Sequence, residues 1–161
     1  MPTFYMTNSK IDEAKRILKI ADHMAYITYP VLKEHRLLIK ILEQISKALT
    51  NSVSAILIHE YSQKRIKTYT DPKLNFDTFK DISTSYGLNE GHIKTIKNVS
   101  NLMESHNRST MEFIRKDKFV IMSDNLQTQD ITLDQVKSFL KLSKEIIDKA
   151  EKRFSKDSDL A

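Results

Sequence analysis

Residues 31–71 read VLKEHRLLIKILEQISKALTNSVSAILIHEYSQKRIKTYTD, a stretch of 41 residues without a glycine or a proline. Apolar residues recur in it three or four positions apart, the spacing that places side chains on one face of a helix. This face consists of Leu38, Ile41, Leu42, Ile45, Ala48, Leu49, Ser52, Ala55, Ile56 and His59. The pattern predicts one long helix from about Glu34 to about Arg65, the expected spine of a helical bundle.

A helix is also expected before this stretch. Ser9 and Asp12 have the spacing of a helix cap, so the first helix is predicted to begin near Ser9. Its apolar stripe is wide, which indicates burial on more than one side. Tyr29-Pro30 is expected to end or kink it, because the residue before a proline is pushed away from helical angles.

Three further helices are expected after the long one. Asp71-Pro72 suits the start of a short helix and Gly87 its C-terminal cap. Asn89 and Glu90 open a fourth helix, and the capping spacing of Thr132 and Gln135 opens the last.

The helical pattern stops between residues 105 and 132. Ser109 and Glu112 have capping-box spacing, which predicts about one helical turn from Met111 to Lys116. Residues 118–122 are largely apolar, and Ser123-Asp-Asn125 is typical of a turn, so a small β-hairpin is predicted at about 118–131. The predicted fold is therefore all-α: one domain over residues 1–161, an antiparallel up-and-down bundle of four to five helices with this hairpin before the last helix. Residues 1–8 and 155–161 are expected to fray.

Composition narrows the class of protein. The chain has 161 residues, 40% of them hydrophobic and 29% charged, as in globular proteins. It has no cysteine, which excludes disulfides, zinc-thiolate sites and cysteine nucleophiles. Without a signal peptide or a long apolar stretch, it is expected to be cytoplasmic and to have no membrane contact. The net charge of +5 is compatible with binding a polyanion, but the basic residues are spread along the chain, which favours lysine-rich solvated helix faces.

The histidines suggest a metal site only weakly. His59-Glu60 resembles the start of a zinc-protease helix, but the second histidine that this motif needs is replaced by Gln63. His23 and His59 could meet between paired helices, with Asp22 or Glu60 as a third ligand. The alternative is that both are core or rim histidines. We predict no metal, no cofactor and no catalytic residue.

The most polar and irregular segment holds the candidate binding residues. Arg108, Arg115, Lys116 and Lys118 are predicted to contact phosphates of a nucleic acid. The alternative is an ordinary solvated loop whose arginines pair with acids or cap carbonyls.

Several stretches resemble uncharacterised archaeal proteins of the HEPN superfamily of helical bundles. They are Ala21-Asp-His-Met-Ala-Tyr26, Thr28-Tyr-Pro30, Asn51-Ser-Val-Ser-Ala-Ile56 and residues 111–122. The resemblance implies a dimeric bundle, metal-independent ribonuclease activity of the toxin–antitoxin type and a nucleotidyltransferase-like protein partner. It also implies an active-site Arg followed by four to six residues and a His near the start of a late helix. Here no His follows Arg108 or Arg115, and the spacing occurs only as Arg16 and His23, in the first helix.

The predicted function is that of a non-enzymatic, HEPN-like helical interaction module. The wide stripe of the first helix is expected to leave apolar surface for a homodimer or for a protein partner. The alternative function is RNA binding, or a divergent metal-independent ribonuclease, through the basic segment.

Overall fold

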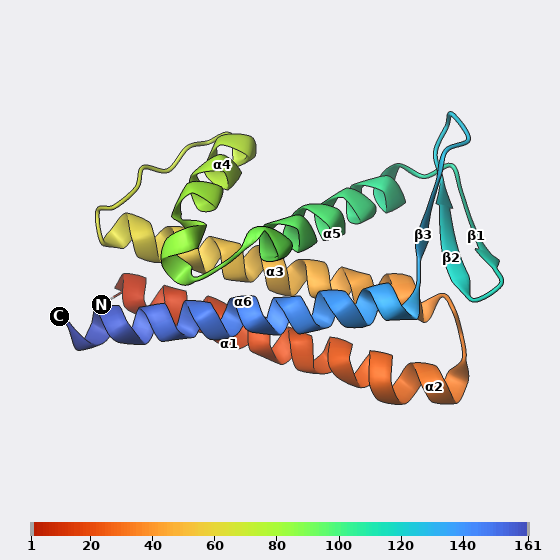
Figure 1. The fold of residues 1–161 in the computed structure, drawn as a ribbon, viewed down its shortest axis with the longest axis horizontal. Helices are drawn as coiled ribbons and strands as arrows, with labels where there is room; N and C mark the ends of the chain where they lie inside the picture. Colours follow the sequence, from red (N-terminus) through yellow and green to blue (C-terminus); the bar gives the residue numbers. More distant parts are fainter. Residues whose placement is uncertain (1, 161) are drawn as a thin grey trace.

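The computed structural model describes residues 2–160 as a mostly helical protein with a small antiparallel sheet (Figure 1). The elements in chain order are α1 (Pro2–His23), the π-helical turn η1 (Met24–Thr28), α2 (Tyr29–Leu32), α3 (Leu37–Ser62), α4 (Pro72–Ser83), the 3-10 turn η2 (Thr84–Tyr86), α5 (Glu90–Arg108), β1 (Met111–Arg115), β2 (Lys118–Met122), β3 (Thr128–Ile131) and α6 (Leu133–Asp159). The mostly-α prediction is confirmed, while the sheet is larger than the predicted hairpin.

Helices α1, α3 and α6 lie side by side along the length of the molecule (Figure 1). All ten residues of the face predicted for the long helix are buried in α3. The helix is shorter than predicted, because the chain turns before Leu37 and again after Ser62. The expectation of a spine is confirmed: α3 contacts α1, α4, α5 and α6.

Pro30 widens the first helix rather than ending it. A proline ring in a helix clashes with the carbonyl four residues earlier, here that of Tyr26, and cannot donate a backbone hydrogen bond. The chain loosens by one residue at this point, and the Tyr29 N–H reaches the Met24 carbonyl five residues back. Helical structure then continues to Leu32 and ends at Lys33, which has a φ of 50°.

The predicted caps are confirmed at three helix starts. The side chains of Asp71, Asn89 and Thr132 each accept a hydrogen bond from a backbone N–H of the first turn that follows. Gly87 has a φ of 74° and ends the α4–η2 segment as predicted, in a left-handed conformation that favours glycine. The Ser9 prediction is wrong, because α1 already begins at Pro2. At the other end α6 continues to Asp159, through most of the tail that was expected to fray; residues 1 and 161 lie outside the described part.

Residues 111–115 form a strand, so the helical turn predicted there is wrong. The Ser109 hydroxyl does donate to Glu112 Oε1 at 2.9 Å, but across an extended Ser109 with a ψ of 143°. Strand β1 pairs with β2 over its whole length, with Phe113 opposite Val120, and β3 pairs with the other edge of β2. Cross-strand packing of apolar side chains outweighs the local capping signal. In residues 2–160 we find no helix with the length and apolar character that crossing a membrane requires.

Candidate functional site

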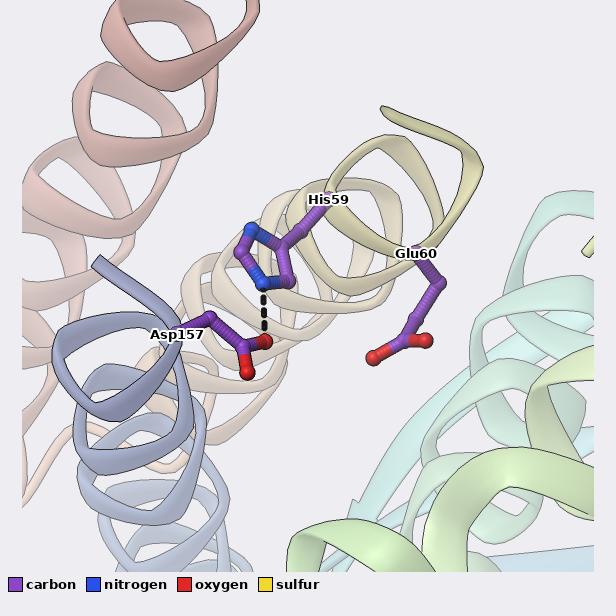
Figure 2. Close-up of side chains that lie close together, drawn as sticks. All are labelled: His59, Glu60 and Asp157. Atoms are coloured by element: carbon purple, nitrogen blue, oxygen red, sulfur yellow. Dashed lines mark hydrogen bonds and ion pairs between the residues drawn. The ribbon is translucent and has the colours of Figure 1, made fainter. Parts of the chain in front are cut away.

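A cluster of buried ionisable side chains lies where α3 and α6 end. His59 and Glu60 come from the last turns of α3, and Asp157 comes from α6 (Figure 2). His59 and Glu60 are buried, and the Asp157 side chain is only 7% exposed. His59 Nε2 lies 2.7 Å from Asp157 Oδ2. Burying such groups is costly unless each finds a partner, so their hydrogen bonds define what the cluster is.

The turn that ends α3 places a basic partner, Arg65, beside these acidic groups. Lys64 adopts a left-handed conformation with a φ of 60° and donates its N–H to the Tyr61 carbonyl, while the Arg65 N–H reaches the Glu60 carbonyl. These two bonds form the Schellman motif that commonly ends helices, here with a lysine in the position that glycine usually takes. The motif turns the chain back, and it places the Arg65 side chain over the end of its own helix.

Arg65 joins the two carboxylates. Its Nη1 lies 3.0 Å from Glu60 Oε1 and 3.0 Å from Asp157 Oδ2, and its Nη2 lies 3.1 Å from Asp157 Oδ1. The hydrogen bonds from Arg65 are the main cause that holds the pKa of Asp157 far below its usual range, and the bond from His59 adds to it. The same contact raises the pKa of Arg65. Both groups are therefore charged at neutral pH.

Two aromatic rings and a second arginine complete the cluster. The Tyr86 hydroxyl donates to Glu60 Oε1 at 2.8 Å, and burial raises the pKa of this phenol. Arg153 Nε lies 3.4 Å from Asp157 Oδ2, and its guanidinium stacks over the Tyr86 ring. Phe154 packs against the rings of His59 and Tyr86. Two guanidinium groups thus balance two carboxylates, and the cluster ties α3, η2 and α6 together.

The cluster has metal-ligand residue types, but their arrangement does not fit a metal. Donor atoms of His59, Glu60 and Asp157 lie within 4.8 Å of one another, and they form the only such group among residues 2–160. The space that a cation would need between the carboxylates is held by the Arg65 guanidinium, which a metal would have to displace. The arrangement is a buried ion-pair network, and its chemistry is structural.

His23 and His59 do not meet, so the alternative of separate core or rim histidines holds for them. His23 lies at an opening lined by Lys144 and Ile147 of α6, whereas His59 bonds to Asp157, at least ten residues further along that helix. Glu60, one of the two suggested third ligands, does lie beside His59, whereas Asp22 pairs with Lys144. Arg16, the other member of the HEPN-like spacing, forms an ion pair with Glu13 on the surface of α1.

The structure divides the four predicted nucleic-acid residues into two places. Arg108 ends α5 and pairs with Glu104 at 3.1 Å. For this residue the structure agrees with the alternative, in which the arginines of the segment pair with acids. Arg115, Lys116 and Lys118 lie at the β1–β2 turn, at the far end of β1 from Arg108, about 16 Å away for a strand of this length. Within the described residues, the side chains of Arg115 and Lys116 make no hydrogen bond and no ion pair.

The outer face of the sheet carries this basic turn. Alternation along the strands points Phe119, Ile121 and Ile131 into the core. The opposite, outer face holds Met111, Phe113, Arg115, Lys118, Val120, Met122, Thr128 and Asp130, of which Val120 is buried and Phe113 half-buried. Arg115 and Lys118 are directly opposite across the strands, an arrangement of like charges that is destabilising unless an anion lies nearby. Lys118 meets Asp130 at 3.7 Å, which leaves Arg115 uncompensated.

The turn is held against the bundle by His35. Its Nδ1 lies 2.6 Å from the Tyr29 hydroxyl, and its Nε2 lies 3.8 Å from Asp117, the residue that follows Lys116. Lys116 itself has a φ of 56°, a left-handed conformation that is strained for a lysine. The turn thus lies beside His35, while its basic side chains extend into solvent.

A third feature is the apolar surface at the end of the first helix. We call it the outer patch: Ile20, Tyr26, Ile27, Val31 and Leu32, exposed by 41%, 48%, 54%, 77% and 62%. These residues belong to α1, η1 and α2 along the lower side of the bundle in Figure 1. Single exposed apolar residues are ordinary, whereas five within thirteen positions of one helical segment leave an unusually large apolar surface in solvent.

A scan against protein-family models, a search of curated proteins and a search of solved structures each found no match for this chain.

Proposed function

We propose that this protein is a non-enzymatic helical interaction module, HEPN-like in its architecture, that self-associates through the outer patch. The single observation that carries the proposal is the exposure of Ile27 and Val31, two large aliphatic side chains four residues apart, in the π-helical turn η1 and in the short helix α2. Burying such side chains against another chain gains about 1.5–3 kcal/mol each. A helix face of this kind pairs readily with a second copy of itself around a two-fold axis.

Replacing Ile27 by Glu is expected to convert the wild-type dimer into a monomer. The carboxylate would be buried without a partner in the dimer and solvated in the monomer, so Kd is expected to rise by at least about 100-fold. Size-exclusion chromatography with light scattering measures the mass directly. Leu74→Glu is the matched control, because Leu74 is also exposed, by 45%, and lies on α4, away from the outer patch. A monomeric wild type, or an Ile27→Glu variant of unchanged mass, would contradict the proposal.

We propose single-stranded RNA binding by the outer face of the sheet as a second candidate function. It is favoured by the uncompensated Arg115 beside Lys118, with Phe113 on the same face. Flanking cations neutralise the phosphates of such an RNA strand, and a ring on the same face, here the half-buried Phe113, can stack with an unpaired base. The cluster around His59 offers no such surface, since its groups already satisfy one another.

The double variant Arg115→Ala/Lys118→Ala is expected to bind a fluorescein-labelled oligouridine roughly tenfold more weakly at low salt. Removing two phosphate contacts should also reduce the slope of log K against log salt by about 1.4. Fluorescence anisotropy over a salt series gives both quantities. Lys152→Ala/Lys156→Ala removes the same charge from exposed positions of α6 and should change neither by as much. An equal loss of affinity in the two double variants would show that binding depends on net charge alone and would contradict a site at this turn.

A further inference from the structure

A long apolar groove lies between α3, α4 and α5, and the bundle leaves it open. Helices α4 and α5 diverge from the turn at Gly87 and form a V over α3 (Figure 1). The groove has a volume of about 860 Å³. Its floor is made of Leu49, Val53 and Leu57 from α3 with Ile96 from α5, and Phe76 forms one wall.

The dimensions of the groove match an α-helix. It follows α3 from Ser46 to Ile58, which is about 18 Å at the rise of a helix. Dividing the volume by this length gives the groove a mean cross-section of about 50 Å². Half of the cross-section of a helix about 10–12 Å wide has a similar area. A helix of about three turns would therefore lie in the groove half submerged. A single acyl chain is much thinner and would leave water against the apolar floor.

The groove edge suits the close approach of a helix. Ser46, Thr50 and Ser54 recur every four residues along α3 and line the groove with small side chains. Small residues in such a row let a second helix pack with its backbone near. Together with the open volume beside them, they form a groove of helix size that no described helix of this chain occupies.

The charge of the groove specifies the kind of helix. Lys97 is the one charged side chain in its lining, and no acidic residue joins it. Lys97 Nζ lies 6.0 Å from the centre of the Phe76 ring, a cation–π contact, and Lys97 makes no ion pair within residues 2–160. The neighbouring Lys80 reaches the same ring at 5.9 Å but is already paired with Asp77. An acidic residue on a bound helix would form an ion pair with Lys97.

We infer that the groove between α3, α4 and α5 binds an amphipathic helix of a protein partner, with its apolar face on Val53 and Leu57 and an acidic side chain at Lys97. This extends the proposed function as an interaction module, but it uses a different face from the outer patch. The mode is that of a helix laid into a hydrophobic groove, read by apolar residues at positions i, i+4 and i+7.

The test is selection from a yeast-displayed library of helical peptides of about 14 residues, the length that spans the groove. Peptides enriched on the wild type are expected to share apolar residues at i, i+4 and i+7 and an acidic residue beside them. Val53→Trp fills the groove and should weaken them at least tenfold. Lys97→Glu should weaken them similarly and, used as bait, should enrich basic peptides instead. Lys94→Glu, one turn earlier on α5 and outside the lining, is the matched control.

The inference is overturned if no peptide is enriched, if the enriched peptides bind Val53→Trp and the wild type equally, or if Lys97→Glu keeps the preference for acidic peptides. Lys97→Glu changes only an exposed side chain, so it decides the question even where Val53→Trp fails to fold. Ile27→Glu should bind the peptides as the wild type does. Loss of self-association and loss of peptide binding therefore contradict separate proposals.

Discussion

Replacing Arg65 by Met is expected to lower the free energy of unfolding by about 3 kcal/mol, the lower end of what breaking a buried ion pair costs. The substitution keeps most of the side-chain volume and removes the charge. Glu60, 2% exposed, and Asp157, 7% exposed, would then face each other without the guanidinium that now lies between them. The lower end applies because Arg65 itself is 35% exposed, so water can replace part of its contacts. Urea unfolding followed by circular dichroism measures the change.

Arg16→Met is the matched control for this experiment. Arg16 also makes two hydrogen bonds to one carboxylate, that of Glu13, at 2.8 and 2.6 Å, but both side chains are largely exposed. Exposed pairs of this kind contribute little, because water solvates each partner when the pair is broken. If Arg65→Met is no more destabilising than Arg16→Met, the cluster around His59 does not hold the ends of α3 and α6 together.

The helical part of this fold could be predicted from the sequence because its signals are local. The apolar face of α3 and the caps at Asp71, Asn89 and Thr132 each depend on residues within a few positions of one another. Strand β1 could not be predicted in the same way, since its stability comes from β2, and the Ser109–Glu112 spacing is equally compatible with a helix start. The effect of Pro30 could be predicted only in part. The sequence locates the disturbance, but whether the helix ends or widens there depends on packing.

The buried ion network was only partly visible in the sequence. His59 and Glu60 stood out as adjacent polar residues on an apolar helix, yet their partner Asp157 lies 98 positions beyond His59 and looked like part of a solvated tail. Arg65 reaches them because Lys64 adopts a left-handed conformation. Such a conformation is predicted at a glycine, and no residue pattern predicts it at this lysine. The four basic residues are exposed, but their division between the end of α5 and the β1–β2 turn follows from strand pairing, which the sequence did not predict for residues 111–115.

The outer patch and the basic turn adjoin each other near His35, which bonds to Tyr29 of α2 and lies 3.8 Å from Asp117 of the turn, whereas the groove is elsewhere. The outer patch is on α1 and α2, the basic turn is at the β1–β2 end, and the groove lies between α3, α4 and α5. A buried network with satisfied charges gives the bundle a rigid end without using any of these surfaces. Under the proposed function, binding at the groove therefore need not disturb the other two surfaces.

Asp157→Asn is expected to remove about 2–3 kcal/mol of stability at neutral pH, a typical contribution of an aspartate whose pKa is strongly lowered by an ion pair. Hydrogen bonds from Arg65, then from His59, lower the pKa of Asp157 in the folded state. In the unfolded chain the pKa returns to about 3.9. The stabilisation is thus fully present above the unfolded pKa and is lost as the pH falls through the folded one. The wild-type free energy of unfolding should fall below about pH 4.5, and the Asn variant should lack this component.

The two stability curves should therefore approach each other toward low pH, because protonation of Asp157 in the unfolded chain progressively removes the advantage of its ion pair in the folded state, which the Asn variant does not have. Urea titrations at intervals from neutral pH to pH 3 would trace both curves. Glu13→Gln serves as the control: Arg16 also lowers the pKa of Glu13, but that pair is in solvent, so its acid dependence should be screened by salt. Curves for Asp157→Asn and the wild type that stay parallel over this range would show that Asp157 is not the ionised centre of the network, and the argument that Arg65 holds the place of a metal would fail with it.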